Sequence, residues 1–186
     1  MTVRTPTTIV RWVPNLQQLY RWLDAGATYD PASSYASVAR FGDGTIKTLY
    51  LAATPEGAMA EYFRRHPEFL ALQDKLAIRL FEVDLRVEGT CVDVRTDAGQ
   101  RAADITRDRL VSSEHDENLR YAECRELATW AVAESFDGIS YPSAAAMWDT
   151  WNLVLFGDPT SGRWIATGTR VIARPIIEET AVRCLA

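Results

Sequence analysis

The sequence predicts an α+β fold in a single domain. Strand-like and helix-like segments follow one another in mixed order along the 186 residues, and the strand-like segments cluster late in the chain. A doubly wound parallel sheet would instead need regular alternation of the two. A composition of 47% hydrophobic and 24% charged residues is typical of one globular domain. We therefore expect one domain over residues 1–186, with its motif-bearing core at about 8–173.

Three segments are predicted before the first long helix. β-branched and aromatic residues at Thr8–Val13 predict a strand that Pro14 closes. Apolar residues at helical spacing then predict a short helix over Leu16–Leu23. Asp24–Ser37 is rich in Gly, Pro, Ser and Asp, which predicts a loop of a length that often covers a ligand.

The segment Leu49–Ala53 predicts a strand that runs directly into a helix. Thr54 is suited to cap this helix, and Pro55 presets the backbone of its first turn. The helix should end near Arg65, because Pro67 disfavours helical geometry in the residue before it.

The C-terminal half predicts one more helix and most of the strands. Leu119–Ser135 has an amphipathic pattern, and Asp137 with Gly138 is expected to cap its end. Alternation and β-branched content predict strands at Ala77–Leu85, Cys91–Val94, Gly138–Tyr141, Asn152–Phe156 and Trp164–Ala173.

Charge and metal-ligand content narrow the functional classes. A net charge of −5 argues against binding of nucleic-acid backbones, which requires clustered cations, but a few arginines can still be focused on a small anion. Cys91, Cys124 and Cys184 are odd in number and widely spaced, so neither a disulfide framework nor a zinc site is expected. His66 and His115 are too distant in the sequence to indicate a metal site.

No targeting signal is recognised in the sequence. Residues 1–8 have no apolar core of signal-peptide length, and no uninterrupted apolar run is long enough to span a bilayer. Together with the cysteine pattern, this predicts a soluble protein of the reducing cytoplasm.

Arg11 and Arg40 are the first candidates for binding a ligand. Arginine has a planar charged fork that suits a pyrophosphate, and both residues are adjacent to strands and followed by aromatic residues. The alternative for either is a surface ion pair. Trp12, Phe41 and Tyr50 could stack on an aromatic ring, and the alternative for them is the hydrophobic core.

Glu61 and Ser143 are the candidates for chemistry. Glu61 shares its helix face with Gly57 and Ala58, which leaves room for a ligand, although a helical glutamate usually faces solvent. Ser143 could donate a hydrogen bond to a ligand or satisfy its own turn. No Gly-x-Ser-x-Gly frame accompanies it, and no Gly-x-Gly-x-x-Gly motif joins a strand to a helix, so neither a serine hydrolase nor a Rossmann site is expected.

Taken together, these motifs resemble the RES-domain family, the toxin component of a class of bacterial toxin–antitoxin systems. The resemblance runs from about Arg11 to Phe156 and rests on the order and spacing of several short motifs. These are Arg11-Trp12, Arg40-Phe41, Leu49-Tyr50-Leu51-Ala52 with Ala60-Glu61, and Gly138-Ile139-Ser140-Tyr141-Pro142-Ser143. Arg40, Glu61 and Ser143 are similar in order and separation to the Arg, Glu and Ser that name the family.

The resemblance implies an ADP-ribosyltransferase-like fold, a split β-sheet core with flanking helices that holds NAD+ as substrate without a metal. It implies cleavage of NAD+ by water or phosphate, or transfer of ADP-ribose to a protein. In this interpretation Glu61 stabilises the reacting ribose, Arg11 and Arg40 bind the pyrophosphate, Tyr50 packs against the nicotinamide or its ribose, and Ser143 orients the ring or the ribose. Trp12 accompanies Arg11 in the binding site.

The resemblance also implies a helix-turn-helix antitoxin as partner, in a hetero-oligomer, and leaves a homo-oligomer open. The family commonly has Gly-Arg-Trp/Phe-Asn followed by prolines, whereas this chain has Ala39-Arg40-Phe41-Gly42-Asp43-Gly44, so that Gly42-Asp43-Gly44 replaces the Asn and the prolines. The chain also departs at Ala144–Ala146, where a basic residue is common. Two alternatives therefore stay open, an inactive module that binds a nucleotide or a protein partner, and, less in keeping with the acidic charge, a nuclease.

Overall fold

The computed structural model of the protein describes residues 9, 11–12, 16–24, 26–66, 78–112, 117–144, 150–158 and 164–173. Within them, nine strands form one sheet in the order β1-β6-β7-β8-β4-β2-β5-β9, and β3 pairs with β4 outside this path. The strands are β1 Arg11–Trp12, β2 Leu16–Asp24, β3 Tyr35–Ala39, β4 Gly42–Ala52, β5 Ile78–Val87, β6 Cys91–Asp93, β7 Gly138–Pro142, β8 Trp151–Phe156 and β9 Trp164–Val171. The helices are α1 Pro55–Arg65, α2 Asp97–Ala102, α3 Arg107–Val111 and α4 Glu117–Ala133.

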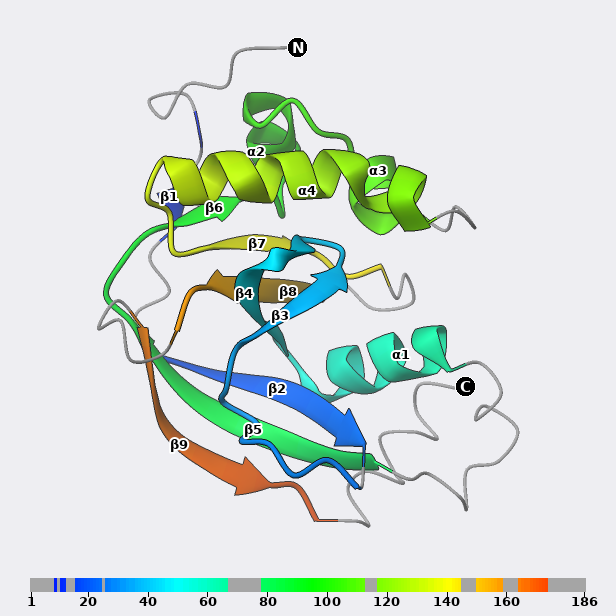
Figure 1. The fold of residues 1–186 in the computed structure, drawn as a ribbon, viewed down its shortest axis with the longest axis vertical. Helices are drawn as coiled ribbons and strands as arrows, with labels where there is room; N and C mark the ends of the chain where they lie inside the picture. Colours follow the sequence, from blue (N-terminus) through cyan, green and yellow to red (C-terminus); the bar gives the residue numbers. More distant parts are fainter. Residues whose placement is uncertain are drawn as a thin grey trace.

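The sheet is mixed, curled and flanked by helices, so the prediction of an α+β fold is confirmed. β6 and β7 are parallel, whereas β8 is antiparallel to both β7 and β4. Figure 1 shows α2, α3 and α4 grouped beside β6 and β7 at one end of the molecule, and β2, β5 and β9 at the other. Helix α1 packs against β2 and β4.

The two halves of the sheet are joined through β4. β4 pairs with β8 over residues Thr48–Ala52, but its register with β2 consists of one pair, Tyr20 with Ala52. Beyond that pair the two antiparallel strands are not paired, whereas β2 pairs with β5 along its whole length on its other edge. This lack of pairing splits the sheet and leaves space between the later residues of β2 and the preceding residues of β4.

The prediction of the α1 boundary is confirmed. The Thr54 hydroxyl accepts a hydrogen bond of 3.0 Å from the Gly57 amide, and Pro55 occupies the first turn. Six other predictions are confirmed, with bounds that differ from those predicted by a few residues at each end. They are the five strands β5, β6, β7, β8 and β9 and the helix α4.

The predicted helix at Leu16–Leu23 is wrong, because these residues belong to β2. Leu19, Arg21 and Leu23 are buried, and the residues between them are more exposed, which is the two-residue period of a strand. The apolar spacing of this short segment fits both periods, and pairing along nine residues with β5 decided between them.

The predicted cap of α4 at Asp137 and Gly138 is also wrong. The helix ends at Ala133, Ser135 takes the left-handed conformation with φ 63°, and Gly138 opens β7. Gly138 is needed there because a Cβ would lie 2.2 Å from the carbonyl oxygen of Val154 on β8.

Several elements were not predicted from the sequence. These are α2, α3, strand β3 and the first half of β4. Of the predicted first strand, Arg11 and Trp12 form β1, and Thr8, Val10 and Val13 lie outside the described residues. Cys91 and Cys124 are free and buried, whereas Cys184 and His115 lie outside the described residues. No helix in the described part of the chain is long and apolar enough to cross a membrane.

Candidate functional site

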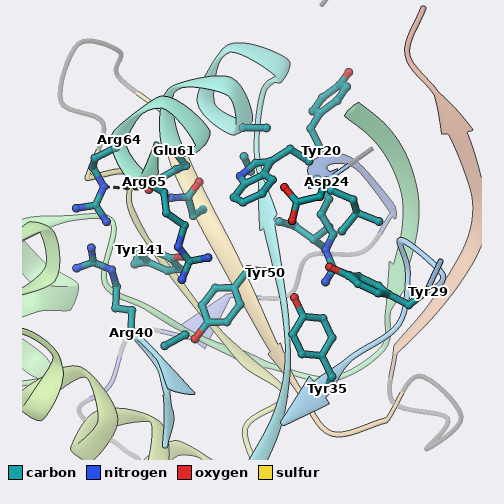
Figure 2. Close-up of a pocket in the computed structure, with 18 of the residues that line it drawn as sticks. Tyr20, Asp24, Tyr29, Tyr35, Arg40, Tyr50, Glu61, Arg64, Arg65 and Tyr141 are labelled. Atoms are coloured by element: carbon teal, nitrogen blue, oxygen red, sulfur yellow. Dashed lines mark hydrogen bonds and ion pairs between the residues drawn. The ribbon is translucent and has the colours of Figure 1, made fainter. Parts of the chain in front are cut away.

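A cavity of about 400 Å³ opens where the sheet splits. Its walls come from the diverging parts of β2 and β4, from the inner face of α1, and from the starts of β3 and β8. The lining includes Tyr20–Asp24, Tyr29, Tyr35, Ala39, Arg40, Tyr50–Ala52, Ala58, Glu61, Arg64, Arg65, Tyr121, Tyr141 and Asn152. This set combines cations, one helical carboxylate and several aromatic rings (Figure 2).

Arg40 and Phe41 form the two-residue turn between β3 and β4. Turn side chains usually face solvent, but here Arg40 is 7% exposed and Phe41 is fully buried. Phe41 packs against Tyr141 with ring centroids 4.7 Å apart, and its amide donates a 2.9 Å hydrogen bond to the Tyr50 hydroxyl. Arg125 of α4 also donates to the carbonyl of Ala39 at 3.1 Å. The turn is thus held inside the molecule by α4, β4 and β7.

This burial places the Arg40 guanidinium at the cavity wall. Its Nη1 donates to the carbonyl oxygen of Leu110, and its guanidinium carbon lies 5.0 Å from the centre of the Tyr121 ring. Its Nη2 is buried and has no hydrogen-bond partner among the described residues. A buried charged donor without an acceptor is costly, so this atom is suited to an anionic ligand.

Glu61 points from α1 toward the same space. Its Oε1 accepts hydrogen bonds from Ser143 Oγ at 2.8 Å, from the Ala144 amide at 3.1 Å and from Asn152 Nδ2 at 3.0 Å. Its Oε2 accepts from Arg64 Nε at 3.3 Å. All of these donors favour the ionised carboxylate.

The electrostatic balance keeps Glu61 charged. Burial by itself would raise the pKa of Glu61, but the Arg64 charge, the Ser143 hydrogen bond, the Arg40 charge and the Asn152 hydrogen bond together lower it below its ordinary value. The cavity therefore holds a fixed anion at neutral pH. Such a group suits the stabilisation of positive charge on a substrate and is a poor proton donor.

The cavity also contains two arginines that sequence analysis missed. Arg64 and Arg65, in the last turn of α1, line it together with Arg40. Figure 2 shows the guanidinium groups of all three directed into the space beside Glu61 and Tyr141. Three cations around one carboxylate leave this end of the cavity positive and favourable for phosphate oxygens.

The other end of the cavity is aromatic and was also missed. Tyr29 and Tyr35 lie with ring centroids 5.5 Å apart, and Trp22 and Asp24 also line the cavity. Arg21 lies 5.8 and 5.3 Å from these two rings and donates to the carbonyls of Pro31 and Ser33, which ties the loop after β2 to the sheet. A sequence signal existed, because Tyr20-Arg21-Trp22 repeats the arginine-aromatic pair seen at Arg11 and Arg40.

The candidate residues from the sequence are brought together only in part. Arg40, Tyr50 and Glu61 line the cavity, and Ser143 lies behind Glu61 at 2% exposure. Arg11 does not line it, because β1 pairs with β6 at the edge of the other half of the sheet.

The Arg11 guanidinium is stacked 4.9 Å over Phe136, and Trp12 pairs through its backbone with Cys91. Ala58 lines the cavity as expected, but a Cβ on Gly57 would lie 3.0 Å from the Thr150 hydroxyl, so this glycine packs against the chain rather than leaving room for a ligand. Gly42-Asp43-Gly44 forms the start of β4.

The charged groups that line the cavity include the carboxylates of Glu61 and Asp24 and the guanidinium groups of the arginines. Burial raises the pKa of the Tyr50 and Tyr141 hydroxyls, so both stay protonated at neutral pH. Among the described residues, no group of three or more His, Cys, Asp or Glu side chains is placed to hold a metal ion.

The crystal structure of the M. tuberculosis MbcT–MbcA toxin–antitoxin complex contains a chain with a similar fold, at a TM-score of 0.70 and 17% sequence identity, with 94% of this chain and 92% of that chain covered. No match was found among the curated proteins. Residues 11–172 match the RES domain, which is most of the sequence. This chain therefore belongs to the RES domain family.

Proposed function

We propose that the protein binds NAD+ in this cavity and breaks the bond between nicotinamide and ribose. The observation that carries the proposal is the pairing of two groups in one cavity, an ionised carboxylate on Glu61 and a buried, unpartnered Nη2 on Arg40. Membership of the RES domain family supports it, since the family resemblance implies NAD+ as substrate.

The carboxylate is suited to the reaction. When the bond breaks, its electron pair leaves with the nicotinamide ring, which becomes neutral, and positive charge builds on the ribose. Glu61 lowers the energy of this oxocarbenium-like state by facing it with a fixed negative charge, as carboxylates do in glycoside hydrolysis. A nucleophile then attacks the ribose, and three acceptors are compatible with an open cavity: water, phosphate or a protein side chain.

The two ends of the cavity are suited to the rest of the dinucleotide. The positive end, with Arg40, Arg64 and Arg65, would hold the pyrophosphate, and the aromatic end, with Tyr29 and Tyr35, would stack on a base. A volume of about 400 Å³ falls in the usual range for small-molecule sites. Arg11 and Trp12, which were expected at the pyrophosphate, have no part in this arrangement.

Two residues have supporting roles in the proposal. The Tyr50 ring would pack against the nicotinamide or its ribose, while its hydroxyl accepts from the Phe41 amide and fixes the turn that carries Arg40. Ser143 would orient Glu61 directly and the ribose only through it, because its hydroxyl is buried against Oε1.

We further propose that the protein is a cytoplasmic toxin held inactive by an antitoxin, with a helix-turn-helix protein as the expected partner. This proposal is supported by membership of the RES domain family and by the fold that the protein shares with a chain of a toxin–antitoxin complex. Expression of the wild-type chain should then arrest bacterial growth, and Glu61→Gln should relieve the arrest at equal protein level.

The direct test is release of nicotinamide from NAD+ by purified wild-type protein and by Glu61→Gln, with and without phosphate. Glu88→Gln is the matched control, since it removes an exposed carboxylate outside the cavity. Release by wild type and by the control, with a loss of about 100-fold or more in Glu61→Gln, would support the proposal. A phosphate requirement would identify the acceptor.

Failure of the wild-type protein to release nicotinamide, with or without phosphate, would exclude water and phosphate as acceptors. Labelled NAD+ incubated with cell extract would then test transfer of ADP-ribose to a protein. If no label is transferred, the inactive binding module becomes the better description of the chain.

A further inference from the structure

The Glu61 carboxylate is bound asymmetrically. Oε1 accepts three hydrogen bonds, from Ser143, from the Ala144 amide and from Asn152, whereas Oε2 accepts one longer bond from Arg64. A carboxylate oxygen with three donors has little capacity left for a ligand. Oε2 is therefore the oxygen with capacity left for a ligand.

Sheet topology explains why Asn152 is one of these donors. β8 lies between β4 and β7 and is antiparallel to both, so its first residues lie beside the last residues of its neighbours. Asn152 is paired with Ala52 on one side and Tyr141 on the other. It therefore stands at the strand ends where β4 leads into α1, the helix that carries Glu61.

The orientation of the Asn152 amide follows from chemistry. An ionised carboxylate only accepts hydrogen bonds, so Nδ2 must face Glu61 and Oδ1 must face elsewhere. Asn152 is 3% exposed and lines the cavity, and its Oδ1 is buried without a hydrogen-bond partner among the described residues. A buried acceptor beside a ligand cavity is suited to a donor on the ligand.

We propose that Asn152 is a further functional residue of the site: its Nδ2 holds Glu61 in place, and its Oδ1 accepts a hydrogen bond from a ribose hydroxyl of the bound dinucleotide. This inference rests on the proposed function for its ligand. The only uncharged donors on the reacting part of NAD+ are the ribose hydroxyls and the nicotinamide amide, and the ribose is the part that Glu61 must face. Asn152 thus connects recognition of the sugar to the position of the catalytic carboxylate.

The first test needs no substrate. The Glu61 carboxyl is titrated by NMR with isotope-labelled glutamate, its signal being assigned from its absence in Glu61→Gln. Asn152→Ala should raise the pKa of Glu61 toward its ordinary value, because one donor to the ionised form is lost. Gln100→Ala is the matched control, since it removes a buried amide that donates to Val94 outside the cavity. An unchanged Glu61 titration in Asn152→Ala would overturn the positioning role.

The second test measures nicotinamide release in a double-mutant cycle. Asn152→Ala should lower kcat about tenfold in the wild-type background, the size expected when a buried polar group loses its partner. The loss should be smaller in a Glu61→Gln background, because the part of the effect that acts through the Glu61 carboxylate is already absent there. Equal losses in both backgrounds would contradict the positioning role, and Gln100→Ala controls for stability.

The hydroxyl contact is tested with NAD+ analogues that lack one hydroxyl of the nicotinamide ribose, by affinity as well as by turnover. One such analogue should bind wild type about tenfold more weakly than NAD+ and should bind Asn152→Ala nearly as well as NAD+ does. If every analogue loses the same factor in both proteins, Oδ1 does not touch the ribose. If wild type binds NAD+ but does not cleave it, the proposed reaction fails while both roles of Asn152 remain measurable; if it does not bind NAD+, the hydroxyl contact is overturned.

Discussion

Ser143 donates a hydrogen bond of 2.8 Å to Glu61 Oε1, although the two residues are 82 positions apart in the sequence. The bond joins the end of β7 to the middle of α1, and it makes the serine part of the support for the carboxylate. Two residues expected to contact a ligand separately are therefore one unit, in which Glu61 faces the cavity and Ser143 lies behind it. The effects of changing them should be correlated.

Ser143→Ala should lower kcat for nicotinamide release about tenfold and change KM for NAD+ little, because the carboxylate loses a donor but the cavity wall is unchanged. Ser143→Thr, which keeps the hydroxyl, should retain more activity. Ser33→Ala is the control, since that hydroxyl donates to Asp30 outside the cavity. A rise in KM without loss of kcat would instead indicate direct contact between Ser143 and the substrate.

Arg40→Ala should raise KM for NAD+ about tenfold or more, since the cavity loses the cation whose Nη2 is unpartnered. It should also lower the free energy of unfolding by about 1 to 3 kcal/mol, because the Leu110 carbonyl loses its donor. Steady-state kinetics and urea denaturation measure the two effects. Arg109→Ala, which removes an exposed arginine paired with Glu123, should change neither greatly. Unchanged NAD+ affinity in Arg40→Ala would remove this residue from the pyrophosphate site.

Glu61 should make stability depend on pH in a defined direction. Its pKa in the folded protein is below the ordinary value of 4.5, so the stability that its charge contributes is fully present above about pH 4.5 and is lost as the pH falls through the folded pKa. Urea denaturation of wild type and Glu61→Gln at several pH values should therefore show a difference in unfolding free energy that shrinks on acidification below 4.5. A difference that grows on acidification would mean that burial outweighs the donors and that the pKa is raised.

Gly138→Ala should destabilise the protein by about 1 to 3 kcal/mol, the usual cost of overpacking a well-packed interior. The added Cβ would lie 2.2 Å from the Val154 carbonyl oxygen, and backbone atoms of a central strand pair cannot easily move away. Gly26→Ala is the control, because a Cβ there meets nothing within 4 Å. Thermal denaturation compares the two, and equal melting temperatures would show that β7 and β8 can separate to accommodate the methyl group.

Local signals in the sequence were sufficient for much of the fold. Thr54 and Pro55 marked the start of α1, the alternation in Ala77–Leu85 marked β5, and the amphipathic pattern from Leu119 marked α4. These signals depend on residues within a few positions of each other, through capping, fixed backbone angles and the period of the apolar side chains. The types of group needed for the site, a carboxylate, arginines and aromatic rings, were recognisable in the same way.

The geometry of the site was decided by the tertiary structure. Leu16–Asp24 became a strand because β5 was available to pair with it, and this pairing brought Arg21 and Trp22 to the cavity, while β1 kept Arg11 away from it. Likewise, Asn152 lies beside Glu61 only because β8 runs between β4 and β7. Pairing between strands joins residues that are far apart in the sequence, and no pattern within a short segment carries information about which partner it will meet.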